Sequence, residues 1–264
     1  MYLKILSYFN KRKNIIMDLR NEDCIEGIKT LEDNSLDLIF CDLPYGCTDC
    51  TWDNKLDLNK LAEQLWRIAK DKCTIVFTCK MKFGYEILNA MGIKYFRYDM
   101  VWKKARPCGY LNSNRMPMVY HENILIFYKK CPADIYKKNK QRIHKIINTG
   151  ATKKLYTNKV YGKINNIKKT TAGYYEPKLP SSVMDITHNN KKLLNSTQKP
   201  LELIEFFIKY YTEEGALVLD PTFGSGTTAV ACKNNNRRFI GFELNTEQYN
   251  TAVARIKGFK DTAP

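Results

Sequence analysis

The chain has 264 residues, of which 44% are hydrophobic, and it carries a formal net charge of +16. These values exclude a disordered chain and suit one large α/β domain with an insertion, or two small domains. No apolar run approaches the roughly 18 residues of a membrane span. The nine cysteines are irregularly spaced, which argues against a zinc site and predicts reduced thiols in a cytoplasmic protein.

The first half of the chain alternates between strand-like and helix-like segments. Residues 1–13 are predicted to be a disordered N-terminal extension, because a short apolar start is followed by Lys11-Arg12-Lys13. Hydrophobic periodicity then predicts strands at 14–19, 36–41, 73–78, 98–102 and 123–128, and helices at 24–31, 58–69 and 85–91. The strand at 36–41 runs directly into the turn signal Asp42-Leu43-Pro44-Tyr45.

A strongly basic segment follows the strand at 123–128. Between Lys129 and Lys192 there are 16 Lys and Arg residues against three acids, which supplies +13 of the chain's +16, and five tyrosines are interleaved. A merely solvated charge run usually carries both signs. The segment therefore favours a surface that binds nucleic acid, with a disordered basic loop as the alternative.

Regular structure is expected to resume at Pro200. Periodicity predicts helices at 201–211, 227–233 and 248–256, and strands at 216–220 and 238–242. The alternation predicts a mostly parallel sheet covered on both faces. The turn from Asp220 to Thr227 has the spacing Asp-x-x-x-Gly-x-Gly, and Glu243 ends the next strand. This pattern indicates a nucleotide site, but it is not the glycine spacing of nicotinamide enzymes.

Asp42 lies just beyond the carboxyl end of a predicted strand, where open α/β sheets bind their ligands. Its carboxylate and a neighbouring backbone carbonyl can each accept a hydrogen bond from an exocyclic NH2 group. The ring of Tyr45 can stack on a base. Alone, this tetrapeptide is an ordinary turn motif, so its meaning depends on the rest of the chain.

The three segments Asp42–Tyr45, Ser196–Pro200 and Asp220–Thr227, in this order, resemble the β-class DNA amino-methyltransferases over residues 15–258. Supporting matches are Asn21-Glu22-Asp23-Cys24, Val101-Trp102-Lys103-Lys104 and His121-Glu122-Asn123. The resemblance implies a class I methyltransferase fold, which is Rossmann-like, with a mostly parallel seven-stranded sheet in circularly permuted order. Its parts would be a catalytic half at 14–128, a basic target-recognition insert at 129–194, a cofactor-binding half at 195–258 and a tail at 259–264.

The resemblance also implies the site. The catalytic positions would be Asp42, the carbonyl of Pro44 and the ring of Tyr45. The positions that would bind S-adenosylmethionine are Asp23, Cys24, Thr197, Gln198, Lys199, Asp220, Phe223, Gly224, Ser225, Gly226, Thr227 and Glu243. No metal is expected. Leu43 replaces the first proline of the family tetrapeptide, which predicts a looser loop, and Asn195-Ser196 replaces a His-Pro pair.

The implied reaction is methylation of N6 of an adenine flipped out of duplex DNA, because Asp in the first position of the tetrapeptide accompanies adenine in the family. The alternatives are an N4-cytosine DNA methyltransferase and an RNA amino-methyltransferase. A nucleic-acid binder without activity is disfavoured by the paired motifs. A C5-cytosine mechanism is disfavoured because it needs a Pro-Cys nucleophile, and the chain contains none. The family also brings a homodimer and a separate cognate restriction enzyme into consideration as partners.

Overall fold

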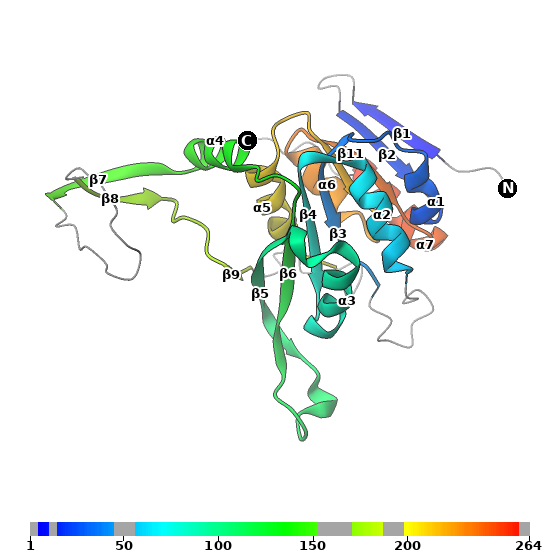
Figure 1. The fold of residues 1–264 in the computed structure, drawn as a ribbon, viewed down its shortest axis with the longest axis horizontal. Helices are drawn as coiled ribbons and strands as arrows, with labels where there is room; N and C mark the ends of the chain where they lie inside the picture. Colours follow the sequence, from blue (N-terminus) through cyan, green and yellow to red (C-terminus); the bar gives the residue numbers. More distant parts are fainter. Residues whose placement is uncertain (1–4, 11–14, 45–55, 153–170, 187–197, 259–264) are drawn as a thin grey trace.

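The computed structural model describes residues 5–10, 15–44, 56–152, 171–186 and 198–258 (Figure 1). Its frame is a nine-stranded sheet in the order β1-β2-β11-β10-β3-β4-β6-β5-β9. The strands are β1 Ile5–Asn10, β2 Ile15–Arg20, β3 Leu36–Cys41, β4 Ala69–Cys79, β5 Phe96–Cys108, β6 Val119–Phe127, β9 Val183–Asp185, β10 Leu217–Asp220 and β11 Arg238–Phe242. The pairs from β2 to β4 are parallel, and β6 is antiparallel to both of its neighbours. The expected seven strands are therefore present, and β1 and β9 are added at the two edges.

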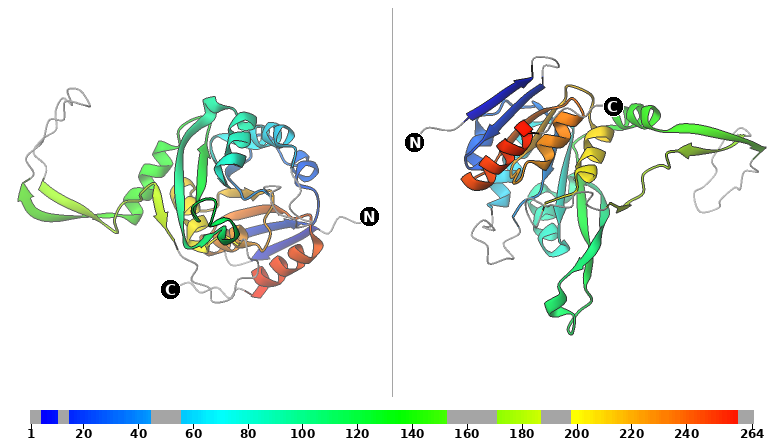
Figure 2. Two further views of the ribbon diagram at one scale, coloured as in Figure 1. Left: turned by 90° about the horizontal axis from the view of Figure 1, so that it is seen from below. Right: turned by 180° about the vertical axis from the view of Figure 1, so that it is seen from behind.

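Helices cover both faces of the sheet (Figure 2). They are α1 Cys24–Lys29, α2 Leu58–Ile68 and α3 Met81–Met91 on one face, and α5 Leu201–Tyr211, α6 Thr227–Asn234 and α7 Thr246–Gly258 on the other. The strand side chains alternate between two apolar cores: Leu38 and Phe40 point to the α5–α7 side, whereas Ile39 and Cys41 point to the α1–α3 side. Both sheet faces are thus buried, as a parallel α/β sheet requires.

The N-terminal strand corrects one expectation. β1 pairs antiparallel with β2, from Ile5 opposite Arg20 to Asn10 opposite Ile15. The prediction that residues 1–13 are a disordered extension is therefore wrong for Ile5–Asn10. The reason is that the outer edge of β2 presents unpaired backbone donors and acceptors, and an added strand satisfies them. Residues 1–4 and 11–13 lie outside the described residues.

The basic insert has regular structure that the sequence pattern did not indicate. After β6 the chain forms α4 Ala133–Ile143, and then the antiparallel pair β7 Lys145–Thr152 and β8 Thr171–Glu176, which projects from the body as an arm (Figure 1). The chain then returns to the main sheet, where β9 pairs with β5. Part of the predicted insert therefore completes the sheet edge.

The arm is anchored at its base by buried polar contacts. Asn139 on α4 donates to the carbonyls of Tyr210 (3.3 Å) and Thr212 (2.9 Å) at the end of α5. The ring of His144 bonds the Tyr210 hydroxyl and lies 2.6 Å from the Pro177 carbonyl. These contacts connect the first and last segments of the arm to one helix of the body.

A second projection is the hairpin of β5 and β6 (Figure 2). A short 3₁₀ helix, η2 Tyr110–Asn112, lies at its outer end, and another, η1 Ile93–Tyr95, precedes β5. The inner part of this hairpin pairs Val101 with Asn123 inside the sheet. Within the described ranges, none of the helices combines the length and the apolar character that a bilayer crossing demands.

Candidate active site

The candidate site lies where the strands β2, β11, β10 and β3 end side by side. β10 and β3 are parallel neighbours, with Val218 opposite Leu38 and Leu219 opposite Ile39, so Asp220 at the end of β10 lies beside Asp42, which follows β3. The Thr222 hydroxyl donates to the Asp42 carbonyl at 3.0 Å, although the two residues are 180 positions apart. The permuted order thus brings the two predicted motifs together.

The Asp42 carboxylate is held by two donors and remains accessible. The buried Thr78 hydroxyl on β4 donates to Oδ1 at 2.6 Å. The Lys199 ammonium lies 2.7 Å from Oδ1 and 2.8 Å from Oδ2. The Asp42 side chain is 25% exposed, so its carboxylate can still accept a hydrogen bond from a ligand.

Lys199 also contacts a second carboxylate. Its side chain is only 7% exposed, and its Nζ lies 3.3 Å from Glu122 Oε2 on β6. Lys104 on β5 forms an ion pair with the other oxygen of Glu122. Burial opposes the charge of Lys199, but Asp42 and Glu122 outweigh burial and raise its pKa. Burial likewise opposes the charge of Glu122, but Lys199 and Lys104 outweigh it and lower the pKa.

The turn after Asp42 is fixed by means other than the missing proline. Leu43 is buried at 3% exposure and belongs to the apolar core under α1–α3. With the Asp42 carbonyl bonded to Thr222, the backbone is held on both sides of the Asp42–Leu43 bond. These contacts hold Asp42 and Leu43 in place without a proline, and the looser loop expected from Leu43 stays a prediction. Tyr45 lies outside the described residues.

The glycine turn after β10 needs two left-handed backbone positions. Gly224 has φ +51° and Gly226 has φ +78°, a region that L side chains rarely adopt. A Cβ on Gly226 would lie 3.1 Å from the Ala252 Cβ on α7, so this glycine also permits close helix packing. The Gly224 N–H donates to Glu243 Oε2 at 3.0 Å, and the Asn245 N–H donates to Oε1 at 2.8 Å.

Asp220 stabilises the glycine turn through buried hydrogen bonds. It is 3% exposed and accepts from the Thr222 N–H (3.0 Å) and from the Thr228 hydroxyl (2.5 Å). Burial raises the pKa of Asp220 to about 7, against the two hydrogen bonds, which lower it. Burial also raises the pKa of Glu243, which is less enclosed. Glu243 therefore faces the site, whereas Asp220 orders the backbone beneath it.

The remaining members of the turn have structural contacts. Phe223 is 4% exposed, and its ring lies between those of Phe239 and Tyr249 (centroids at 6.3 and 6.2 Å), so it anchors the turn in the core. Arg255 on α7 donates to the Ser225 carbonyl (2.9 Å) and to the Thr227 hydroxyl (3.1 Å).

Gln198, just before α5, contacts the glycine turn. Its side-chain oxygen accepts from the Ser225 hydroxyl at 3.5 Å, and both residues are buried. Its chain neighbour Thr197 lies outside the described residues. The segment before α5 is thereby connected to the glycine turn.

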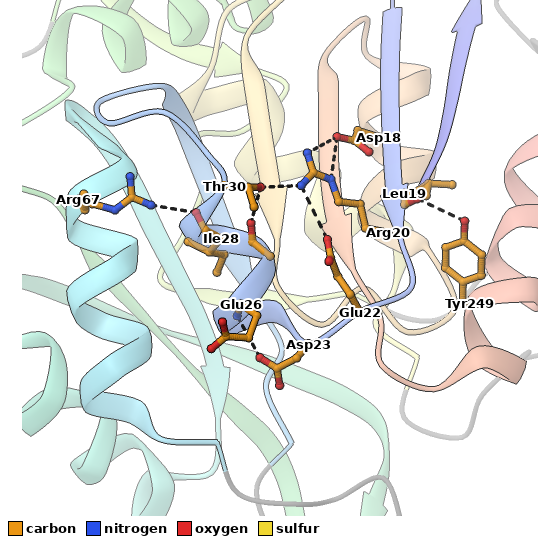
Figure 3. Close-up of polar contacts among 11 residues, drawn as sticks. Asp18, Leu19, Arg20, Glu22, Asp23, Glu26, Ile28, Thr30, Arg67 and Tyr249 are labelled. Atoms are coloured by element: carbon orange, nitrogen blue, oxygen red, sulfur yellow. Dashed lines mark hydrogen bonds and ion pairs between the residues drawn. The ribbon is translucent and has the colours of Figure 1, made fainter. Parts of the chain in front are cut away.

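Asp23 follows the end of β2 (Figure 3), and Cys24 is the next residue along the chain, where α1 begins. Asp23 caps α1, because its Oδ1 accepts from the Ile25 N–H (2.8 Å) and the Glu26 N–H (3.1 Å). Cys24 is buried, and burial raises the pKa of its thiol to about 12, so it is a neutral side chain at physiological pH. Nearby, Arg20 contacts Asp18 at 2.7 Å and secures the end of β2.

Asn21 connects this segment to the neighbouring strand end. Its amide donates to the Glu243 carbonyl at 2.7 Å, and its oxygen accepts from the Thr246 hydroxyl at 2.9 Å. Asp23 and Glu243 are therefore held at adjacent strand ends. Two carboxylates and a glycine turn at one sheet edge provide the acceptors and backbone donors that a nucleoside with a charged tail requires. Among the described residues, no cluster of His, Cys, Asp and Glu is suited to a metal ion.

Four contributors were not predicted as site residues: Thr78, Lys104, Glu122 and Thr222. Two of them lie in segments that had resembled the family, Val101–Lys104 and His121–Asn123, but the pattern gave them no role. β6 runs antiparallel to β4, with Asn123 opposite Cys79, so its beginning rather than its end lies at the site. A local pattern does not reveal this reversal.

Comparison with known proteins gives a consistent result. A family model described as DNA methylase matches residues 36–254. The Type II methyltransferase M.HpaI of Haemophilus parainfluenzae is 30% identical over 250 residues, which cover 89% of this chain and 72% of the relative. M.HinfI of Haemophilus influenzae is 28% identical over 265 residues, covering 90% and 67%.

Two solved structures share the fold. The complex of M1.HpyAVI with SAM aligns with a TM-score of 0.57 and 25% identity, covering 90% of this chain and 99% of that one. The PvuII DNA methyltransferase, which is cytosine-N4-specific, aligns with a TM-score of 0.62 and 16% identity, covering 94% and 88%. At 16% identity the second likeness concerns the fold alone.

Proposed function

This chain belongs to the DNA methylase family, and from that premise we propose that it methylates N6 of an adenine flipped out of duplex DNA. The family makes it an S-adenosylmethionine-dependent DNA methyltransferase. The observation that supports the amine as target is the partly exposed Asp42 carboxylate, oriented by Thr78 and Lys199 beside the glycine turn.

The cofactor would be held by the acids and the turn at the neighbouring strand ends. Glu243 would accept hydrogen bonds from the ribose hydroxyls, Asp23 would lie near the adenine ring, and the turn 220–227 would receive the methionine part. When bound, S-adenosylmethionine supplies a methyl group on a sulfonium, which is an electrophile. The half-buried position of Glu243 and the left-handed backbone of Gly224 suit such a ligand.

The residues of the chain would orient the amine. Asp42 and the Pro44 carbonyl accept its two hydrogens, which turns the nitrogen lone pair away from the ring and toward the methyl donor. Tyr45 would stack on the flipped base. Because the nitrogen becomes acidic only as it is alkylated, Asp42 acts by stabilising the developing positive charge rather than as a strong base.

Adenine is proposed over cytosine because the tetrapeptide begins with Asp42, the residue that accompanies adenine in the resemblance. N4-cytosine methylation is the alternative, since one of the fold neighbours is cytosine-N4-specific. The proposed DNA-binding surface is the segment from Lys129 to Lys192, which includes the arm and supplies +13 of the chain's net charge of +16.

The test is to replace Asp42 by Ala and to identify the methylated base. Wild-type protein should form N6-methyladenine in duplex DNA, detected by mass spectrometry of the digested nucleosides. Asp42→Ala should bind S-adenosylmethionine within about threefold of wild type and lose at least about 10²-fold in methylation rate. Asp71→Asn, an exposed carboxylate paired with Lys130, serves as the matched control and should remain active.

Three outcomes would contradict parts of the proposal. Unchanged methylation by Asp42→Ala would remove this carboxylate from the site. N4-methylcytosine as the product would replace adenine by the alternative base. Faster methylation of RNA than of duplex DNA would transfer the activity to an RNA substrate.

A further inference from the structure

The cation that contacts Asp42 comes from a distant segment and is enclosed. Lys199 lies just before α5, 157 residues from Asp42 in sequence, and its ammonium contacts both oxygens of that carboxylate. On its other side it contacts Glu122. At 7% exposure, its charge is supported by these two carboxylates rather than by bulk water.

The cluster consists of two acids and two bases in alternating order. Asp42 contacts Lys199, Lys199 contacts Glu122, and Glu122 contacts Lys104. The four formal charges cancel. If Lys199 lost its charge, Asp42 and Glu122 would face each other's field in a partly buried place without a cation between them. Like charges repel, so the Asp42 carboxylate would rotate away or take up a proton.

The arrangement leaves Asp42 one direction in which to bind a ligand. A carboxylate offers about four acceptor positions. The Thr78 hydroxyl and the Lys199 ammonium occupy Oδ1, and Lys199 also occupies one side of Oδ2. An incoming amine must therefore approach the remaining side of Oδ2. Lys199 and Thr78 determine which lone pair is available and where it points.

We propose that Lys199 and Glu122 are positioning residues, which fix the Asp42 carboxylate for the amine, and that Lys199 serves this function rather than cofactor binding. The inference rests on the proposed amine-methylating function. Lys199 supplies the charge that holds Asp42, and Glu122 holds Lys199 in place from the opposite side. Neither residue needs to touch the reacting atoms.

The experiment compares Lys199→Met, Glu122→Gln and the double variant in single-turnover methylation of duplex DNA. Lys199→Met should lower the rate at least about 10²-fold, while the dissociation constant for S-adenosylmethionine changes less than about threefold. Glu122→Gln should lower the rate about three- to tenfold. The double variant should be at least about tenfold faster than Lys199→Met, because removing Glu122's charge relieves the repulsion on Asp42.

A control Lys–Asp pair lies at the other end of β3, the strand that precedes Asp42. Lys70 is 43% exposed and forms a 2.7 Å ion pair with Asp37 at the beginning of β3, so Lys70→Met removes a more exposed Lys–Asp pair away from the site and should keep the wild-type rate. Thermal melting of every variant reports folding. If Lys199→Met does not fold, Glu122→Gln carries the test, since it preserves size and should slow methylation without weakening cofactor binding.

The outcomes separate the inference from the function on which it rests. If wild-type protein methylates no nucleic acid, the proposed function fails. If wild-type protein is active and Lys199→Met is equally active, the inference fails. It also fails if Lys199→Met weakens S-adenosylmethionine binding by the factor that it costs in rate, which would make Lys199 a cofactor ligand. Additive losses in the double variant would show that the two residues act independently.

Discussion

Asp220 makes folding stability depend on pH in an unusual direction. Burial raises its pKa to about 7 in the native state, whereas an Asp in an unfolded chain titrates near about 3.9. Between these values the native state binds the proton and the unfolded state releases it. The carboxyl therefore favours folding fully below about pH 4, and this contribution is lost as pH rises through about 7. From pH 5 to pH 8 the loss amounts to about 2–3 kcal/mol.

Asp220→Asn removes the titration while it keeps an acceptor for the Thr222 N–H. We expect the wild-type advantage in unfolding free energy over Asp220→Asn to be largest at pH 5 and to shrink by about 2–3 kcal/mol at pH 8. Urea unfolding at constant ionic strength, followed by circular dichroism at several pH values, measures this difference. Groups elsewhere titrate equally in both proteins and cancel in the comparison.

A difference that stays constant across pH, or that grows as pH rises, would refute the reasoning, because it would mean that Asp220 is ionised at low pH in the native state. Thr228→Val provides a further check. The Thr228 hydroxyl donates to Asp220 and lowers its pKa. Its removal should therefore move the loss of stability to higher pH.

Two other predictions concern the turn and the arm. Gly226→Ala should lower the free energy of unfolding by about 2–4 kcal/mol, because of left-handed backbone strain and crowding against α7. Gly224→Ala has more space and should lower it by about 1–2 kcal/mol. Equal losses in melting temperature for the two variants would contradict this difference. Lys137→Ala on α4 and Lys178→Ala just after β8, both at the base of the arm, should each reduce the slope of log affinity for DNA against log salt by about 1, while Lys257→Ala on α7 should not. Binding titrations at several salt concentrations measure this slope. If it is unchanged in both arm variants, the arm is not the surface that binds DNA.

The elements in the body were predictable because burial imposes a pattern on them. β3 and β11 begin and end at the predicted residues, Leu36–Cys41 and Arg238–Phe242, since both are apolar runs bounded by turn residues. The hairpin of β5 and β6 was predicted too short. Beyond Lys103, which lies opposite His121, it projects into solvent, and no buried face imposes alternation on its sequence.

The candidate site was predictable in its motifs but not in its connections. Asp42 and Glu243 each follow a recognisable strand, Asp220 ends another, and the sheet places the three together. The contact between Lys199 and Asp42 joins residues 157 positions apart, and a spacing rule has no means of indicating it. Phe223 was predicted to bind the cofactor, yet its ring lies in the core, because an apolar residue in a turn motif can serve packing as well as binding.

The adjacency of β3 and β10 also has a consequence for protein synthesis. The strand that presents Asp42 is made early, but its central neighbour is made only after about 180 further residues, the separation of Asp42 from Thr222. At about 5–20 residues per second, this interval lasts about 10–35 s. In the last part of that time, once the segment 129–192 has been made, the nascent chain has its basic arm but an open sheet edge at β3 and no glycine turn. If the arm binds DNA as proposed, the emerging polypeptide meets DNA before it is able to methylate it.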